Sequence, residues 1–192
     1  MNTQLRRLRA DTVSATVDDI DDLPDPRLTI VAAWRPVHAL CARLDADSRR
    51  RGRPFVPLIM EGATLSIGPV VRPDTGGCWH CWIRRRHQHE PSAVVRSVVA
   101  AYYDAHIDAG PRGYLEATAL LGAAQLSEII SRIDRGECAG GELWQMNILT
   151  REVVTGAVIS VDGCSHCGSG ASFDRTFGEL QRRFADWNGR CS

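Results

Sequence analysis

Residues 54–81 read PFVPLIMEGATLSIGPVVRPDTGGCWHC, and they join two apolar runs to a pair of cysteines. The runs at residues 55–60 and 65–71 have the length and apolar content of strands buried in a sheet. Cys78 and Cys81 follow two glycines, and their spacing lets both thiolates reach one ion from a single tight turn. The stretch therefore predicts two strands that lead directly into half of a metal site.

A second pair of cysteines, Cys164 and Cys167, has the same spacing and also lies between glycines. Together the two pairs offer four thiolates, which is the ligand set of a closed tetrahedral zinc site. A disulfide, a redox Cys-x-x-Cys motif and chance are the alternatives. We predict structural Zn²⁺ as the cofactor, with the ligands Cys78, Cys81, Cys164 and Cys167. A closed site leaves no position for water or substrate, so its expected contribution is stability and not catalysis.

The remaining histidines and cysteines near these turns give weaker signals. His80 and His166 lie inside the two turns and are interpreted as spacers, the alternative being that one replaces a cysteine as ligand. Cys41 falls on the apolar face of an expected helix, and neither Cys138 nor Cys191 has a persuasive base nearby in sequence. We therefore predict no catalytic residue, and no cofactor-binding residue besides the zinc ligands.

The composition argues against several classes of protein. The 192 residues carry a formal net charge of zero, which gives no overall field for nucleic acid, and 44% of them are hydrophobic. The opening residues MNTQLRR lack the apolar run of a signal peptide, and no stretch approaches the length of a membrane span. Paired thiols in such a chain fit a reducing compartment. We expect a cytoplasmic protein with no nucleic-acid partner and no membrane partner.

The chain before the first cysteine pair alternates strands with a helix. Residues 28–33 form a short apolar run typical of a strand buried on both faces of a parallel sheet. A helix is expected from Pro36, in its first turn, to about residue 50, ahead of the strand at residues 55–60. Strand, helix and strand of these lengths predict a right-handed α/β crossover. Residues 12–17 alternate weakly and could form a further short strand.

The second half of the chain predicts further helices and a pair of strands. Helical periodicity covers residues 92–109 and 114–133, with a Gly-Pro break between them. Residues 142–148 and 153–161 alternate polar and apolar side chains, as two antiparallel strands do, and the second cysteine pair follows at once. Residues 175–187 carry an apolar stripe and are expected to form a final helix.

Three consecutive arginines, Arg84, Arg85 and Arg86, follow the first cysteine pair. The first interpretation of such a run is a solvated surface. The alternative is a contact with an anion, a peptide carboxylate or a partner chain, because the run adjoins the predicted zinc turn.

This succession resembles the C-terminal part of the ubiquitin-activating-like (ThiF/MoeB) superfamily over about residues 28–168. The stretches GPVVRP…GGCWHCWIRRR and GCSHCG carry the resemblance. It implies an α/β fold class, a truncated Rossmann-like ThiF-type domain with a structural zinc site and a C-terminal β-pair plus helix. The implied domains are an N-terminal segment (residues 1–27), a ThiF-like partial domain with the zinc site (28–170) and a C-terminal helix (171–192).

Within the superfamily, the chain most resembles the McbB-like and SagC-like proteins, which assist a YcaO-type cyclodehydratase in maturing thiazole- and oxazole-containing peptides. The expected function is a non-catalytic zinc-containing subunit of such a complex, which positions the peptide or stimulates the cyclodehydratase. The expected partners are that enzyme or another operon-encoded enzyme, a precursor peptide, and further chains in a homodimer or hetero-oligomer. Trp34, Trp82 and residues 177–187 are the candidate contacts.

Departures from the superfamily pattern define the alternative. An adenylating member needs a Gly-x-Gly-x-x-Gly turn that receives nucleotide phosphates at a helix N-terminus, and this sequence has no such motif. The isolated chain is therefore expected not to be catalytic. The alternative is a split, ATP-dependent, ThiF/MoeB-like adenylating enzyme whose nucleotide site is completed by another chain. A third hypothesis, a zinc-ribbon nucleic-acid binder, is disfavoured by the zero net charge.

Overall fold

The computed structural model describes residues 26–74, 76–106, 108–111, 114–167, 177–178 and 180–181. The expected strand at residues 12–17 and most of the expected helix at residues 175–187 lie outside this part of the chain. The three predicted domains with bounds at residues 27 and 170 stay a prediction for the same reason. No helix among the described residues is long and apolar enough to span a membrane.

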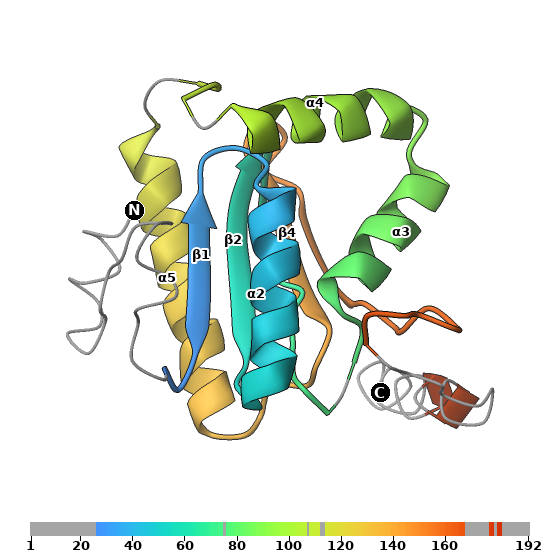
Figure 1. Cartoon of the computed structure of the whole chain (residues 1–192). Helices are drawn as coiled ribbons and strands as arrows, with labels where there is room; N and C mark the ends of the chain where they lie inside the picture. Colours follow the sequence, from blue (N-terminus) through green and yellow to red (C-terminus); the bar gives the residue numbers. More distant parts are fainter. Residues whose placement is uncertain are drawn as a thin grey trace.

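Five strands form one mixed sheet, in which they lie side by side in the order of the chain (Figure 1). The strands are β1 (Thr29–Ala33), β2 (Phe55–Glu61), β3 (Thr64–Ile67), β4 (Glu142–Asn147) and β5 (Val153–Ala157). β1 and β2 are parallel, and every later pair is antiparallel. The expected α/β class, the strand–helix–strand unit and the antiparallel pair after the helices are confirmed.

Among the described residues, four helices surround the sheet. They are α2 (His38–Arg51), α3 (Trp79–His89), α4 (Ala93–Ala105) and α5 (Glu116–Asp134). In Figure 1, α2 lies in front of the sheet and α5 behind it, while α4 crosses the end toward which β1 and β2 point. The described part of the chain therefore has three layers, with α4 across one end.

The core consists of two apolar clusters, one on each face of the sheet. β2 separates them: Phe55 and Ile59 contribute to the cluster beneath α2 and α3, whereas Val56, Leu58 and Met60 contribute to the cluster beneath α5. This alternation follows from the two-residue period of a strand. β2 is thus the strand that is buried on both faces.

The structure corrects three details of the expected elements. β1 is an edge strand among the described strands, with only Val31 buried, so it is not buried on both faces. α2 begins at His38 with Val37 as its N-cap, which leaves Pro36 before the helix and not in its first turn. β3 ends at Ile67 and not at residue 71, because Pro69 has no N–H to donate to the ladder.

A candidate metal centre beside a basic cleft

The first cysteine pair is held by the start of α3, a helix that the sequence analysis did not predict. Cys78 is the N-cap of this helix, and its sulfur accepts a hydrogen bond from the Cys81 amide at 3.4 Å. The Cys-x-x-Cys spacing therefore coincides with a capped first turn, which orients both sulfurs toward the same side. Cysteine is not one of the preferred N-cap residues, and the arginines and histidines that follow obscure the apolar face of the helix in the sequence.

The glycines before Cys78 are required by close packing against the second half of the chain. The Gly77 amide donates to the carbonyl oxygen of Val158 at 2.9 Å. A Cβ atom on Gly77 would lie 2.6 Å from a methyl carbon of Val158, and one on Gly76 would overlap the backbone of Gly140. Gly76 also has a φ of +76°, which side chains rarely adopt. These contacts fix the first cysteine turn against the segment that leads to the second.

The four predicted cysteine ligands gather in one cluster, and all of their sulfurs lie within 4.8 Å of one another. The Sγ atoms of Cys78 and Cys81 are 3.5 Å apart, and Cys78–Cys164 and Cys81–Cys167 are each separated by 3.7 Å. Four sulfurs about 2.3 Å from a central Zn²⁺ would be about 3.8 Å apart in a tetrahedron. A disulfide requires about 2.05 Å, so these spacings fit a shared metal ion and not a bond.

Hydrogen bonds to sulfur make the cluster suited to thiolates. Backbone amides donate to two of the sulfurs, Val161 to Cys81 at 3.2 Å and Cys81 to Cys78 at 3.4 Å. A metal binds cysteine as the thiolate, so donors of this kind favour the ligating form. The amide of Cys164 in turn donates to the carbonyl oxygen of Val161 at 3.1 Å, which links the two turns.

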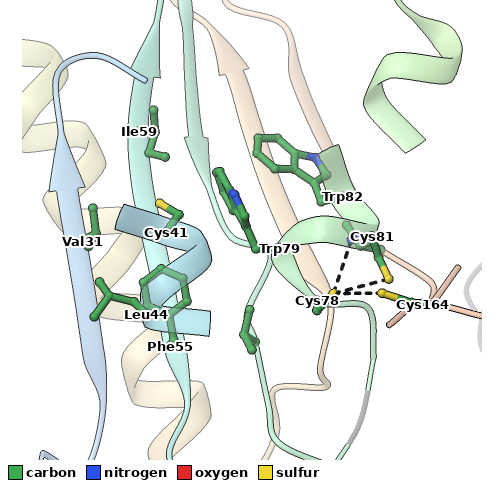
Figure 2. Packing of buried hydrophobic residues seen from close by; sticks show 12 residues of the cluster. Val31, Cys41, Leu44, Phe55, Ile59, Cys78, Trp79, Cys81, Trp82 and Cys164 are labelled. Atoms are coloured by element: carbon green, nitrogen blue, oxygen red, sulfur yellow. Dashed lines mark hydrogen bonds between the residues drawn. The ribbon is translucent and has the colours of Figure 1, made fainter. Parts of the chain in front are cut away.

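The cluster is continuous with the apolar core. Cys78, Cys81 and Cys164 are buried, and they pack in the same cluster as Trp79 and Trp82. Figure 2 shows the sulfurs of Cys78, Cys81 and Cys164 side by side at the start of α3, near Trp79. Cys167 is half-buried. An ion held here would tie α3 to the segment after β5.

A buried carboxylate, Asp45 of α2, also fixes the start of α3. It accepts a hydrogen bond from the Trp79 amide at 3.0 Å and from the Arg49 guanidinium at 3.1 Å. Burial raises the pKa of Asp45, and the bonds from Arg49 and Trp79 oppose that rise. Asp45 was missed in the sequence, although its i,i+4 spacing to Arg49 in the expected helix was an available signal; its bond to the Trp79 amide depends on the fold.

The two histidines of the cysteine turns stack on each other. The ring centroids of His80 and His166 are 3.4 Å apart, and the rings are within 7° of parallel. The donor cluster found among the described residues contains the four cysteines and neither histidine. The spacer interpretation therefore agrees with the geometry.

The three arginines do not form one site. Arg85 donates to the carbonyl oxygens of Ile159 and Ser160, at 2.8 and 3.1 Å, and so ties α3 to the segment between β5 and the second cysteine turn. Arg86 forms an ion pair with Glu61 at 2.6 Å. Arg84 is exposed and lines a cleft of about 380 Å³ between α2, the start of α3 and the second cysteine turn.

The described cysteines outside the cluster are poor nucleophiles. Cys41 and Cys138 are buried, and burial raises the pKa of both thiols. A buried thiol with a raised pKa is protonated at neutral pH and unreactive. Cys191 lies outside the described residues.

Comparison with solved structures identifies the fold. The structure of the heterocyclase TruD matches with a TM-score of 0.61 and 20% identity, over 86% of this chain and 25% of that one. E. coli MccB matches with a TM-score of 0.59 and 11% identity, over 86% of this chain and 48% of that one. This chain has the fold of a segment of TruD and of MccB. The resemblance predicted from the sequence is thereby confirmed as a likeness of fold.

The sequence comparisons add nothing to this likeness. No family model matches the chain, and no curated protein matches it significantly.

A second heterocyclase structure, in complex with substrate and cofactor, matches with a TM-score of 0.58 and 20% identity, over 86% of this chain and 23% of that one. The chain thus spans between about a quarter and a half of the solved proteins that it matches.

Proposed function

We propose that this protein is a non-catalytic, zinc-containing subunit of a complex that matures ribosomal peptides by forming thiazole or oxazole rings. It positions the peptide or stimulates a YcaO-type cyclodehydratase. The observation that carries this proposal is the fold, shared with a segment of the heterocyclase TruD, in which four cysteine sulfurs stand at the spacing of a closed tetrahedral site. The proposed ligands of Zn²⁺ are Cys78, Cys81, Cys164 and Cys167.

The chemistry of the cluster supports a structural role for the ion. Four thiolates complete a tetrahedral Zn²⁺, and no coordination position remains for water or substrate. Cys78 and Cys81 are fully buried in a core cluster, which suits an ion that stabilises the fold. The residues of this chain would hold the two cysteine turns together, and the ion would add stability to that junction.

A partner chain is supported by exposed apolar side chains on α4, on the segment before α5 and in the first turns of α5. We call this set the α4–α5 apolar surface; it comprises Val94, Val95, Val98, Val99, Tyr102, Tyr114, Leu115, Leu120 and Leu121. Val94 is 78% exposed and Leu115 64%. Exposed apolar patches of this kind mark interaction sites in soluble proteins. Trp82, one of the contacts expected from the sequence, is only 6% exposed, so that expectation was wrong.

The test is reconstitution. A YcaO-type cyclodehydratase and a Ser/Cys/Thr-rich peptide encoded beside this chain would be incubated with ATP, with and without the zinc-loaded protein. Cyclodehydration of Cys, Ser or Thr to a thiazoline or oxazoline ring removes one water per modified residue, which mass spectrometry detects. We expect ring formation to require or to be accelerated by this protein. Equal rates in both reactions would contradict the proposal.

The alternative, a split adenylating enzyme, is favoured by one comparison. A structure of E. coli MccB with ATP matches with a TM-score of 0.55 and 12% identity, over 82% of this chain and 44% of that one. A nucleotide site completed by another chain would give ATP–pyrophosphate exchange only after mixing with that chain. Exchange under those conditions, without ring formation, would favour the alternative.

A further inference from the structure

The cleft beside the cysteine cluster has a lining that suits a small anionic group on an otherwise apolar ligand. Its polar lining comes from His38, His80, Arg84, Ser165 and His166, and the rest is apolar apart from Cys164. No lining residue is acidic. The volume of about 380 Å³ is at the low end of the range for small-molecule sites, which suits one side chain or one chain terminus.

Arg84 differs from its two neighbours in having no partner. Arg85 and Arg86 are bound to carbonyl oxygens and to Glu61, whereas Arg84 makes no hydrogen bond or ion pair with any residue that the structure describes. A guanidinium keeps its charge at every physiological pH and presents a planar pair of donors that matches a carboxylate. The cleft therefore contains one permanent positive charge that the described residues leave uncompensated.

His38, the first residue of α2, supplies a donor and no charge. Its ring packs edge-on against Trp79, with ring centroids 5.6 Å apart. Burial lowers the pKa of His38, so its imidazole is neutral at neutral pH and offers one N–H and one acceptor nitrogen. One fixed cation with neutral donors around it matches a monoanion better than the dianion of a phosphate group.

We propose that this cleft binds a carboxylate group of a peptide, with Arg84 as the charged contact. That the ligand is a peptide rests on the proposed function, whereas the carboxylate chemistry follows from the cleft alone. Two sources present this group, an Asp or Glu side chain and a C-terminal carboxylate. The cleft is lined by both cysteine turns, so an intact metal centre would preform it.

A competing role for these basic residues is charge compensation of the metal. Zn²⁺ with four thiolates carries a net charge of −2, and a nearby guanidinium would stabilise it. The two roles can be distinguished by experiment. Substitution of Arg84 should lower the zinc content if Arg84 compensates the charge of the metal centre, but not if it only binds a carboxylate.

The experiment is an NMR titration of the zinc-loaded full chain, which follows the ring signals of His38, assigned with His38→Gln. Three probes are used: an N-acetylated pentapeptide amide with a central Asp, its Asn counterpart, and a pentapeptide with a free C-terminal carboxylate and no acidic side chain. We expect the Asp peptide, the free-terminus peptide or both to bind. Their relative affinities show whether the cleft prefers a side-chain carboxylate or a C-terminal carboxylate. The Asn peptide should bind at least about tenfold more weakly.

Variants test the assignment to Arg84. Arg84→Gln should lower the affinity for the carboxylate probe that binds by at least about tenfold, and Arg84→Lys should retain part of that affinity. Neither variant should change the zinc content. Arg151→Gln is the matched control, since it removes the same charge from the exposed β4–β5 loop, outside the cleft. Equal binding of the Asp and Asn peptides, tighter binding of inorganic phosphate, or loss of zinc in Arg84→Gln would overturn the proposal.

These outcomes are independent of ring formation. Probe binding without any effect on the cyclodehydratase would contradict the proposed function and leave the carboxylate site intact. Stimulation of the cyclodehydratase without probe binding would do the reverse.

Discussion

The cysteine-centre side of the molecule and the α4–α5 apolar surface are built in opposite ways. Around the cysteines, Trp79 and the backbone of Gly76 and Gly77 are packed against distant segments. On α4, by contrast, Ala100 is the one buried residue of the helix, and Val94, Val95 and Val98 are more than 60% exposed. The side chains of the first region are packed against other described residues. The second region is as apolar as a core, but its side chains are exposed. This difference indicates where the chain is self-sufficient and where a partner would add to it.

Loss of the metal centre should have the largest effect. Cys78→Ser or Cys164→Ser should lower the metal content from about one ion per chain toward zero and lower the melting temperature, because the proposed metal would join α3 to the segment after β5. Elemental analysis and thermal denaturation measure both quantities. Ser165→Ala, in the same turn, is the control and should change neither. If the metal-free protein melts at the same temperature as the metal-loaded protein, the metal has no structural role.

Two glycines with almost equal φ angles allow the cost of backbone strain to be distinguished from the cost of a steric clash. Gly76 has φ +76° and lies against the backbone of Gly140, whereas Gly136 has φ +73° and has no atom within 4 Å of an added Cβ. Gly136→Ala should cost roughly 1–2 kcal/mol of unfolding free energy, from the left-handed backbone alone. Gly76→Ala should cost about 3–5 kcal/mol, because overlap with the backbone adds to the strain. Equal losses in urea denaturation would show that the contact between the two halves is not rigid.

The contrast between the regions can be tested directly with two apolar truncations. Ile130 of α5 is 4% exposed, and Ile130→Ala should cost roughly 3 kcal/mol of unfolding free energy through lost burial and the cavity left behind. Val98 of α4 is 65% exposed, and Val98→Ala should change stability by no more than about 0.5 kcal/mol. Chemical denaturation of the isolated chain measures both.

The same surface predicts an effect on assembly. Val98→Asp should leave the isolated chain folded but weaken its complex with a second chain, because a charge would be buried in the contact. Light scattering, alone and with the candidate partner enzyme, reports the assembly state. A monomeric wild type under both conditions, or an unchanged complex of the variant, would mean that this surface is not an interface.

Local patterns predicted more of the molecule than long-range contacts did. The cysteine spacing, the strand at residues 55–60 and the later strand pair were predictable, because each depends on neighbours a few residues apart. The edge position of β1 was not, since a run of apolar residues does not reveal how many strands flank it.

The candidate site shows the same division. The sequence identified the four cysteines that gather, but it treated Arg84, Arg85 and Arg86 as one run. Successive residues of a helix point in different directions, so each arginine meets a different neighbour. Without the helix at residues 79–89 that separation could not be predicted.

The smallest expected effect is electrostatic and concerns the junction between the two regions. Glu61, at the end of β2, accepts hydrogen bonds from Arg86 of α3 at 2.6 Å and from Arg96 of α4 at 2.9 Å. Burial opposes the charged form, but the two guanidinium groups outweigh it and hold the pKa of Glu61 below its ordinary value of 4.5. A carboxyl group with a lowered pKa contributes stability that is fully present above its ordinary pKa and lost as the pH falls through the folded value.

The unfolding free energy of the wild type should therefore decline below about pH 4.5, and Glu61→Gln should make that decline shallower while lowering stability at neutral pH. Glu137→Gln is the matched control. The Arg135 hydrogen bond lowers the pKa of Glu137 as well, but this pair is fully exposed, where water and salt screen its contribution. Denaturation curves between acid and neutral pH distinguish the two variants. If Glu61→Gln leaves the slope as steep as in Glu137→Gln, the ion pairs at the end of β2 do not couple α3 and α4 to the sheet.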